Sequence, residues 1–173
     1  MSSIWRPRTI LIGMVGLSVL MTGCERFPRD PAGTLERVEK RGVLRAGAFE
    51  NPPWVTVEPD GTVTGVEVAL IEDFARELGV SVEWSHEGAE DLFASLEKHE
   101  LDVVIGGITQ QNPWRTQLGF SLPFATIHPG DGEEPKRQVM AVASGENAML
   151  MRLEAFLLSR RDEVEALQVE DAP

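Results

Sequence analysis

The sequence predicts an α/β protein with a mostly parallel sheet that has helices on both faces. Between residues 34 and 158, apolar residues alternate between the spacing of strands and the spacing of amphipathic helices. The stretch 101–108 is almost wholly apolar after Asp102, as expected of a parallel strand buried on both faces. Strands that alternate with helices are joined by right-handed crossovers and lie parallel in one sheet.

Capping and turn residues set the boundaries of the individual elements. Thr34 is placed to cap a short helix that Gly42 ends, and Gly79 ends a longer amphipathic helix. The turn sequence at 58–61 predicts a hairpin, and Asn112-Pro113 predicts a helix start. The expected elements, in chain order, are helix 35–41, strand 43–49, hairpin strands 54–57 and 62–63, helix 66–78, strand 80–84, helix 89–98, strand 101–108, strand 137–143 and a helix from about 146 to 158.

The first 23 residues have the pattern of a lipoprotein signal peptide. Arg6 and Arg8 precede an uncharged run at 10–21, which is too short to cross a bilayer. The run ends just before Cys24 in a segment that resembles a bacterial lipobox, in which cleavage before the cysteine is followed by its lipidation. An uncleaved helix with an incidental cysteine is the alternative. Several acyl chains on Cys24 would anchor the protein stably to a membrane.

The charged, proline-rich segment 24–33 is expected to be a tether between the anchor and the lobe. Glu25 follows the cysteine and resembles the pattern that sorts lipoproteins to the outer membrane, which is therefore slightly favoured over the inner one. The segment 159–173 is expected to be an acidic, partly ordered tail. Removal of the signal peptide takes away two arginines and lowers the formal net charge from −12 to −14.

Composition excludes several classes of protein. The chain has 173 residues, with 16 Lys and Arg against 28 Asp and Glu, which argues against nucleic-acid binding. One cysteine excludes an intrachain disulfide and a multi-cysteine metal site. His86, His99 and His128 lack the spacing of metal ligands. No cofactor and no metal is expected.

Six stretches in order resemble the first lobe of the bacterial extracellular solute-binding proteins of family 3. They are Arg41–Gly47, Asn51–Trp54, Asp60–Val68, Ala75–Val80, Leu101–Thr109 and Phe120–Phe124. The resemblance implies one lobe of a periplasmic-binding-protein-like type II fold, over residues 34–158. Family members normally cross to a second lobe after the last of these stretches and then return. Here the polar loop 128–136 replaces that lobe, so the second lobe is expected to be absent.

The candidate ligand residues lie in two loops that follow strands 43–49 and 101–108, where ligands sit in sheets of this kind. They are Glu50, Asn51, Trp54, Gly106, Gly107, Thr109 and Arg115. Trp54 offers a flat wall, the glycines offer backbone N–H groups to an anion, and Thr109 offers a hydroxyl. The resemblance implies that Arg115, two residues after Pro113, binds a carboxylate through paired hydrogen bonds.

Each candidate also has a purely structural interpretation. Trp54 can fill the base of the hairpin, the glycines can end a strand, and Thr109 can be a turn residue. Arg115 can be an exposed helix arginine, since its spacing to the strand is one residue longer than in the family. Asn51 stands where the family usually has an aromatic residue.

These features predict a lipid-anchored periplasmic module that binds a small polar solute such as an amino acid, as components of ABC importers do. One wall of a cleft leaves the solute exposed, so weak binding is expected unless a partner completes the site. An ABC permease or a sensor is the expected partner, and a homodimer through Met149, Met151 and Phe156 is an alternative to those side chains being core. The alternatives are a non-binding accessory or vestigial module and, less favoured, an enzyme such as a dehydratase on this fold.

Overall fold

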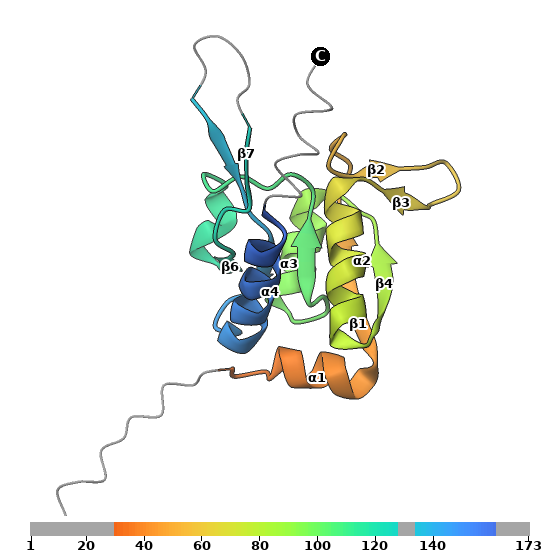
Figure 1. Ribbon diagram of the computed structural model, residues 1–173, viewed down its shortest axis with the longest axis vertical. Coiled ribbons are helices and arrows are strands. Elements are labelled where there is room, and N and C mark those ends of the chain that lie inside the picture. The colour runs from red at the N-terminus through yellow and green to blue at the C-terminus, as the bar shows by residue number, and fades with distance from the viewer. Residues whose placement is uncertain (1–29, 128–133, 162–173) are drawn as a thin grey trace, which may run out of the picture.

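The computed structural model describes residues 30–127 and 134–161, and it confirms the expected α/β lobe (Figure 1). The expected signal peptide, Cys24, most of the tether, most of loop 128–136 and most of the acidic tail lie outside the described residues. Within the described parts of the chain, no helix combines the length and the apolar character needed to cross a membrane.

Helices and strands alternate along the chain much as expected. The helices are α1 (Thr34–Arg41), α2 (Val66–Leu78), α3 (Ala89–Glu97), the 3-10 turn η1 (Pro113–Thr116) and α4 (Asn147–Ser159). The strands are β1 (Val43–Ala48), β2 (Thr56–Val57), β3 (Val63–Thr64), β4 (Ser81–Ser85), β5 (Val103–Ile105), β6 (Leu118–Phe120), β7 (Ala125–Ile127), β8 (Lys136–Gln138) and β9 (Ala141–Ala143).

The main sheet has the strand order β4-β1-β5-β9-β6. β1 is parallel to both β4 and β5, whereas β9 runs antiparallel to β5 and to β6. Four strands therefore share one direction and only β9 is reversed, which agrees with a mostly parallel sheet. Two small antiparallel ribbons, β2–β3 and β7–β8, extend from this body (Figure 1).

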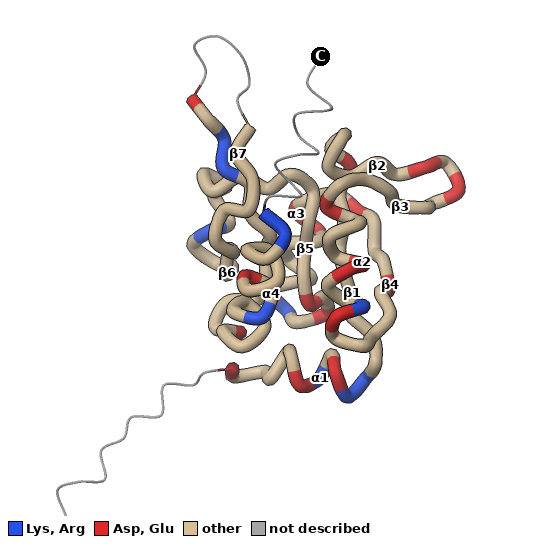
Figure 2. The backbone as a smooth tube through the Cα atoms, viewed as in Figure 1, with Lys and Arg blue, Asp and Glu red and all other residues tan. Residues whose placement is uncertain are grey.

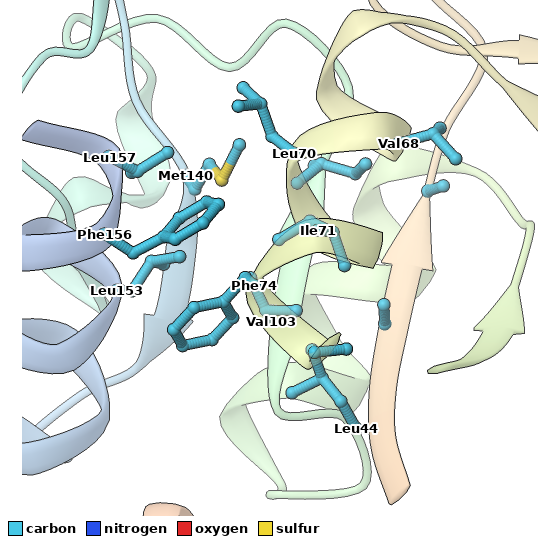
Figure 3. Close-up of a cluster of buried hydrophobic side chains, with 14 of the residues drawn as sticks. Leu44, Val68, Leu70, Ile71, Phe74, Val103, Met140, Leu153, Phe156 and Leu157 are labelled. Carbon is cyan, nitrogen blue, oxygen red and sulfur yellow. The ribbon is translucent and has the colours of Figure 1, made fainter. Parts of the chain in front are cut away.

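Helices cover both faces of the sheet. Val103 and Ile105 of β5 pack on the side of α1, α2 and α4, and the intervening Val104 packs on the side of α3. Figure 3 shows the larger cluster, in which Phe74 of α2 and Phe156 of α4 are neighbours, with their ring centroids 5.4 Å apart. The two faces together explain why the strand sequences are apolar at successive positions.

Several boundaries differ from the sequence prediction. The expected strand 101–108 is shortened to β5, because Gly106 and Gly107 have positive φ values of 149° and 66° and turn the chain. The expected strand 137–143 is divided into β8 and β9, with Ser121 accepting a hydrogen bond from the Met140 N–H. The helix expected after Asn112 is only one 3-10 turn, although the Asn112 side chain caps it as expected.

The methionine-rich side of α4 is divided between core and surface. Met149 and Phe156 are buried, so the core interpretation holds for them, whereas Met151 is 68% exposed. A dimer surface that included Met149 and Phe156 would require the lobe to open. These two side chains are thus not available to a partner in this structure.

The start of α1 is held by a residue from the far end of the chain. Thr34 lies inside the helix and its side chain does not cap it, contrary to the prediction. Glu146, which is buried, instead accepts hydrogen bonds from the backbone N–H groups of Ala32 (2.8 Å) and Thr34 (2.7 Å). Burial acts to raise the pKa of Glu146, but the N–H bonds from Thr34 and Ala32 hold that pKa below its usual value. Glu146 therefore anchors the first described residues to the lobe.

Candidate functional site

The two candidate loops meet at the carboxyl ends of β1 and β5, which are adjacent strands. The Phe49 N–H donates to the Ile105 carbonyl, so the first loop begins beside the end of β5. Asn51 and Val55 then form an antiparallel bridge, with the Asn51 N–H 2.9 Å from the Val55 carbonyl oxygen. The expected position of the site at this end of the sheet is consistent with this geometry.

Trp54 lies at the base of the hairpin and is 8% exposed. Its carbonyl oxygen accepts a hydrogen bond from the Glu67 N–H at the start of α2. A Cβ atom placed on Gly107 would be 3.0 Å from Trp54 Cδ1, so the indole packs closely on the glycine loop. Little of the ring is left to serve as a wall for a solute in this structure, and its ligand role remains a prediction.

The backbone N–H groups of Gly106 and Gly107 point at an anion, but that anion belongs to the protein. Glu67 Oε2 accepts hydrogen bonds from Gly106 (2.8 Å) and Gly107 (2.9 Å). The two groups that were expected to meet a solute carboxylate are therefore occupied by the first turn of α2. A solute could reach them only by displacing Glu67.

Glu67 is fully buried, and its second oxygen, Oε1, has no hydrogen-bond partner among the described residues. Burial raises the pKa of Glu67 to about 7, and the N–H bonds from Gly107 and Gly106 oppose the shift. The carboxyl is thus divided between its charged and neutral forms near neutral pH.

We expect Glu67 to make the stability of the lobe depend on pH. Its pKa is raised in the folded state, so folding binds the proton, and stability from this group falls as pH rises from about 4.5 to about 7. The shift corresponds to about 3 kcal/mol at most. Urea unfolding at pH 5.5 and 8.5 should show this loss in the wild type and not in Glu67→Gln. Glu72→Gln, at an exposed position of α2, should behave as the wild type. An equal pH dependence in Glu67→Gln would contradict the prediction.

Asn51 covers the outer side of the glycine loop. Its side-chain Nδ2 donates to the Gly106 carbonyl oxygen at 2.9 Å, and its residue is exposed. A Cβ atom on Gly107 would approach Asn51 Nδ2 to 2.3 Å. Asn51 thus joins the first loop to the second through a side-chain hydrogen bond.

Thr109 and Arg115 lie farther along the second loop. Thr109 forms an isolated bridge with Gln138, and its carbonyl oxygen accepts from the Asn112 N–H at 2.9 Å, so it also serves as a turn residue. Arg115 is exposed on η1 and its side chain forms no hydrogen bond or ion pair within the described residues. η1 is fixed to α3 instead. The ring centroids of Trp114 and Phe93 are 5.5 Å apart, and Trp114 Nε1 donates a hydrogen bond to the Glu90 carboxylate.

Sequence reasoning missed two buried polar residues near these loops. Glu67 lies three residues before Leu70 and four before Ile71, so it falls on the apolar stripe of α2. A carboxylate in an apolar stripe was the sequence signal that could have identified it. Gln138 is fully buried beside Thr109, and its amide nitrogen and oxygen have no partner among the described residues. Glu50 is exposed, as a surface carboxylate is expected to be.

The described residues contain no cluster of His, Cys, Asp and Glu that could hold a metal ion. A hollow of about 320 Å³ lies away from the glycine loop, beside the β7–β8 ribbon. Its lining consists of Leu122, Pro123, Phe124, Ala125, Thr126, Arg137 and Arg161.

The β7–β8 ribbon follows the stretch Phe120–Phe124, after which the resemblance implies a crossing to a second lobe. Ala125 pairs with Gln138 and Ile127 pairs with Lys136, so the outgoing and returning strands lie directly side by side. Only the short segment 128–135 separates them in sequence. One lobe with a paired crossing is thus the architecture that the described residues define.

Comparison with known proteins agrees with this architecture. The family model of bacterial extracellular solute-binding proteins, family 3, matches residues 44–162. The chain belongs to this family.

Among curated relatives, membrane-bound lytic murein transglycosylase F of Vibrio cholerae is 36% identical over 104 residues, which are 60% of this chain and 19% of that protein. The L-cystine-binding protein TcyJ of Escherichia coli is 30% identical over 118 residues, which are 68% of this chain and 44% of that protein. The chain thus spans about one fifth of the length of the transglycosylase and less than half of the binding protein. These relatives include both enzymes and binding proteins.

Among solved structures, the arginine-bound form of domain 1 from TmArgBP has a TM-score of 0.63 and 27% identity, and covers 71% of this chain and 97% of that chain. Its Phe57Trp mutant has a TM-score of 0.66 and 26% identity, and covers 74% of this chain and 98% of that chain. An ancestral amino-acid-binding protein, AncCDT-1, matches with a TM-score of 0.67 and 17% identity, which supports the fold alone. Nearly all of a single solved domain is therefore matched, which confirms a single-lobe fold.

Proposed function

We propose that this chain is a lipid-anchored periplasmic module that binds a small polar solute, such as an amino acid, weakly on one open face. The main support is the similarity to domain 1 of TmArgBP, a solved single domain that is described as arginine-bound and is matched over almost its whole length. A single lobe of this architecture is thus compatible with a bound amino acid. The cystine-binding relative supports the same class of solute.

The geometry of the loops favours weak binding. Asn51 and Glu50 are exposed at the end of the sheet, and Arg115 is exposed on η1. Exposed ion pairs contribute little free energy, and a solute on one wall leaves much of its surface in water. We therefore expect a dissociation constant of about 1 mM or weaker, which corresponds to about 4 kcal/mol.

Thermal unfolding tests the solute class. For a dissociation constant of about 1 mM, 10 mM solute stabilises the folded lobe by about 1.4 kcal/mol, a shift of about 3 to 5 °C. Residues 25–173 should show this shift with at least one amino acid. Arg115→Ala should lose it, whereas Arg152→Ala, which removes an exposed ion pair with Glu77, should keep it. A wild-type protein that responds to no amino acid would contradict the proposal.

We propose that Cys24 carries the lipid anchor. Expression of the full chain in a Gram-negative host with an alkyne fatty acid should label the wild type and not Cys24→Ser. Membrane fractionation should then place the labelled protein in the outer membrane. Unlabelled wild-type protein would contradict the anchor, and label in the inner membrane would contradict the sorting role of Glu25.

A second candidate is an accessory module without a solute, acting as a protein-interaction or vestigial lobe. The similarity to transglycosylase F favours it, because there the matched segment is only 19% of a larger protein that is named for a different activity. A catalytic role is less favoured, since Glu50 is an exposed acid and catalysis requires positioned acid and base groups in a closed cleft. An ABC permease or a sensor remains the expected partner of the solute-binding form.

A further inference from the structure

We propose that Glu67 is a positioning residue of the candidate site, which fixes the side-chain amide of Asn51 through the peptide unit between Gly106 and Gly107. This inference rests on the proposed function, because Asn51 matters only if the loops bind a solute. It assigns a role to a buried carboxylate that lies below the surface a solute would meet.

The first step is the contact between Glu67 and the glycine loop. One carboxylate oxygen accepts from two successive N–H groups, those of Gly106 and Gly107. Hydrogen bonds to a charged acceptor are stronger than neutral ones, and in a buried position they are not weakened by water. Both glycines adopt positive φ values that other residues rarely adopt, and the Glu67 oxygen fixes that conformation.

The second step passes through one peptide unit. The Gly106 carbonyl and the Gly107 N–H belong to the same planar group and point in opposite directions. The N–H is directed inward to Glu67 Oε2, and the carbonyl oxygen accepts from Asn51 Nδ2 at 2.9 Å. Hydrogen bonds in a chain polarise one another, so the charge of Glu67 strengthens the bond to Asn51.

The consequence concerns the polarity that the site offers. The bond to the Gly106 carbonyl uses one of the two N–H groups of Asn51 Nδ2 and fixes the orientation of the side-chain amide, which leaves Oδ1 to accept a hydrogen bond. Glu67 meanwhile occupies the N–H groups that could have bound a carboxylate. With the glycine N–H groups occupied and Asn51 Oδ1 oriented as an acceptor, this part of the site favours an N–H group of the solute over its carboxylate.

Few other charges influence Glu67. Burial and the two glycine N–H bonds account for the shift in its pKa, and no charged side chain contributes. The first loop brings the exposed Glu50, the β5 loop brings the uncharged glycines, and α2 itself carries the exposed Glu72. Ionisation of Glu67 is thus a local event that the glycine amides should report.

Nuclear magnetic resonance of residues 25–173 without solute tests the relay. The Gly106 and Gly107 amide shifts and the Asn51 side-chain amide shifts should all move between pH 5.5 and 8.5, with one midpoint near 7. Glu67→Gln, which keeps a carbonyl acceptor, should flatten these curves, and Glu72→Gln should leave them unchanged. If Glu67→Gln does not fold, the wild type still tests the proposal, because the glycine and Asn51 amide shifts must titrate with the same midpoint. The proposal would be overturned if the Gly106 and Gly107 amide shifts do not titrate, or if the Asn51 side-chain amide shifts do not change with pH.

A pair of probes tests the polarity of the site. L-arginine at 10 mM should move the Asn51 amide resonances, whereas acetate, which has a carboxylate and no N–H group, should not. Movement with acetate alone, or with neither probe, would overturn the acceptor role of Asn51. The titration without solute stands independently, so a failure of solute binding is distinguishable from a failure of the Glu67 relay.

Discussion

Replacement of Gly107 by alanine is expected to destabilise the lobe by about 2–4 kcal/mol, because the change combines backbone strain with a steric conflict. The residue has φ of 66°, and the added Cβ would be 2.3 Å from Asn51 Nδ2 and 3.0 Å from Trp54 Cδ1. Asn51 must move, which breaks its side-chain bond to Gly106, one of the contacts that join the two candidate loops.

Gly42→Ala is a matched control for this substitution. Gly42 has a similar φ of 72°, but a Cβ atom there would meet nothing within 4 Å. It should therefore cost only the backbone term, about 1–2 kcal/mol. Urea unfolding of both variants separates strain from packing. Equal losses in the two variants would show that the loops are not closely packed at Gly107.

Replacement of Glu146 by alanine is the second large effect that we expect, with a loss of about 3 kcal/mol. The carboxylate accepts from the N–H groups of Ala32 and Thr34, and both donors would lose their acceptor. Because the pKa of Glu146 is lowered in the folded protein, this stabilisation is present above the unfolded value and is lost as pH falls below it.

Hydrogen exchange locates the effect of Glu146→Ala. The amides of residues 32–34 should lose protection. The amides of β1 should keep theirs, once the lower global stability of the variant is taken into account. Glu77→Ala, which removes an exposed ion pair with Arg152, should cost less than about 1 kcal/mol and serves as the control. A Glu146→Ala variant as stable as Glu77→Ala would contradict the anchoring role.

Local patterns in the sequence predicted the fold well. The apolar stripe of α2 predicted its bounds, and the turn at 58–61 predicted the β2–β3 hairpin. The ordered family motifs predicted the first lobe, and the short loop 128–136 predicted that no second lobe follows it. These features depend on residues that are close together in the sequence, so residue spacing is enough to predict them.

The parts that were not predicted depend on contacts between distant segments. Glu146 lies 112 positions from Thr34, so nothing near α1 shows that its cap comes from the loop before α4. Glu67 lies 39 positions from Gly106, and the glycines alone look the same whether their N–H groups meet a solute or the protein's own carboxylate. The division of strand 137–143 likewise depends on Ser121, which bonds to Met140 from another strand region.

The acidic surface does not by itself define the solute. Figure 2 shows Asp and Glu at the tip of the β2–β3 hairpin and along α2, with Lys and Arg interspersed elsewhere. Charge at the hairpin tip and at the exposed positions of α2 is screened in solution and influences the approach of a solute more than its affinity. Specificity is expected to come from the few groups at Asn51, the glycine loop and Arg115.

Calorimetric titration of residues 25–173 with a panel of amino acids tests the central proposal most directly, because it measures whether one lobe forms a working half-site. We expect saturable binding with a dissociation constant of about 1 mM or weaker, and the loss of that binding in Arg115→Ala. Low-micromolar affinity would contradict it by showing that one lobe makes a complete site, and the absence of any saturable response would contradict it in favour of an accessory module.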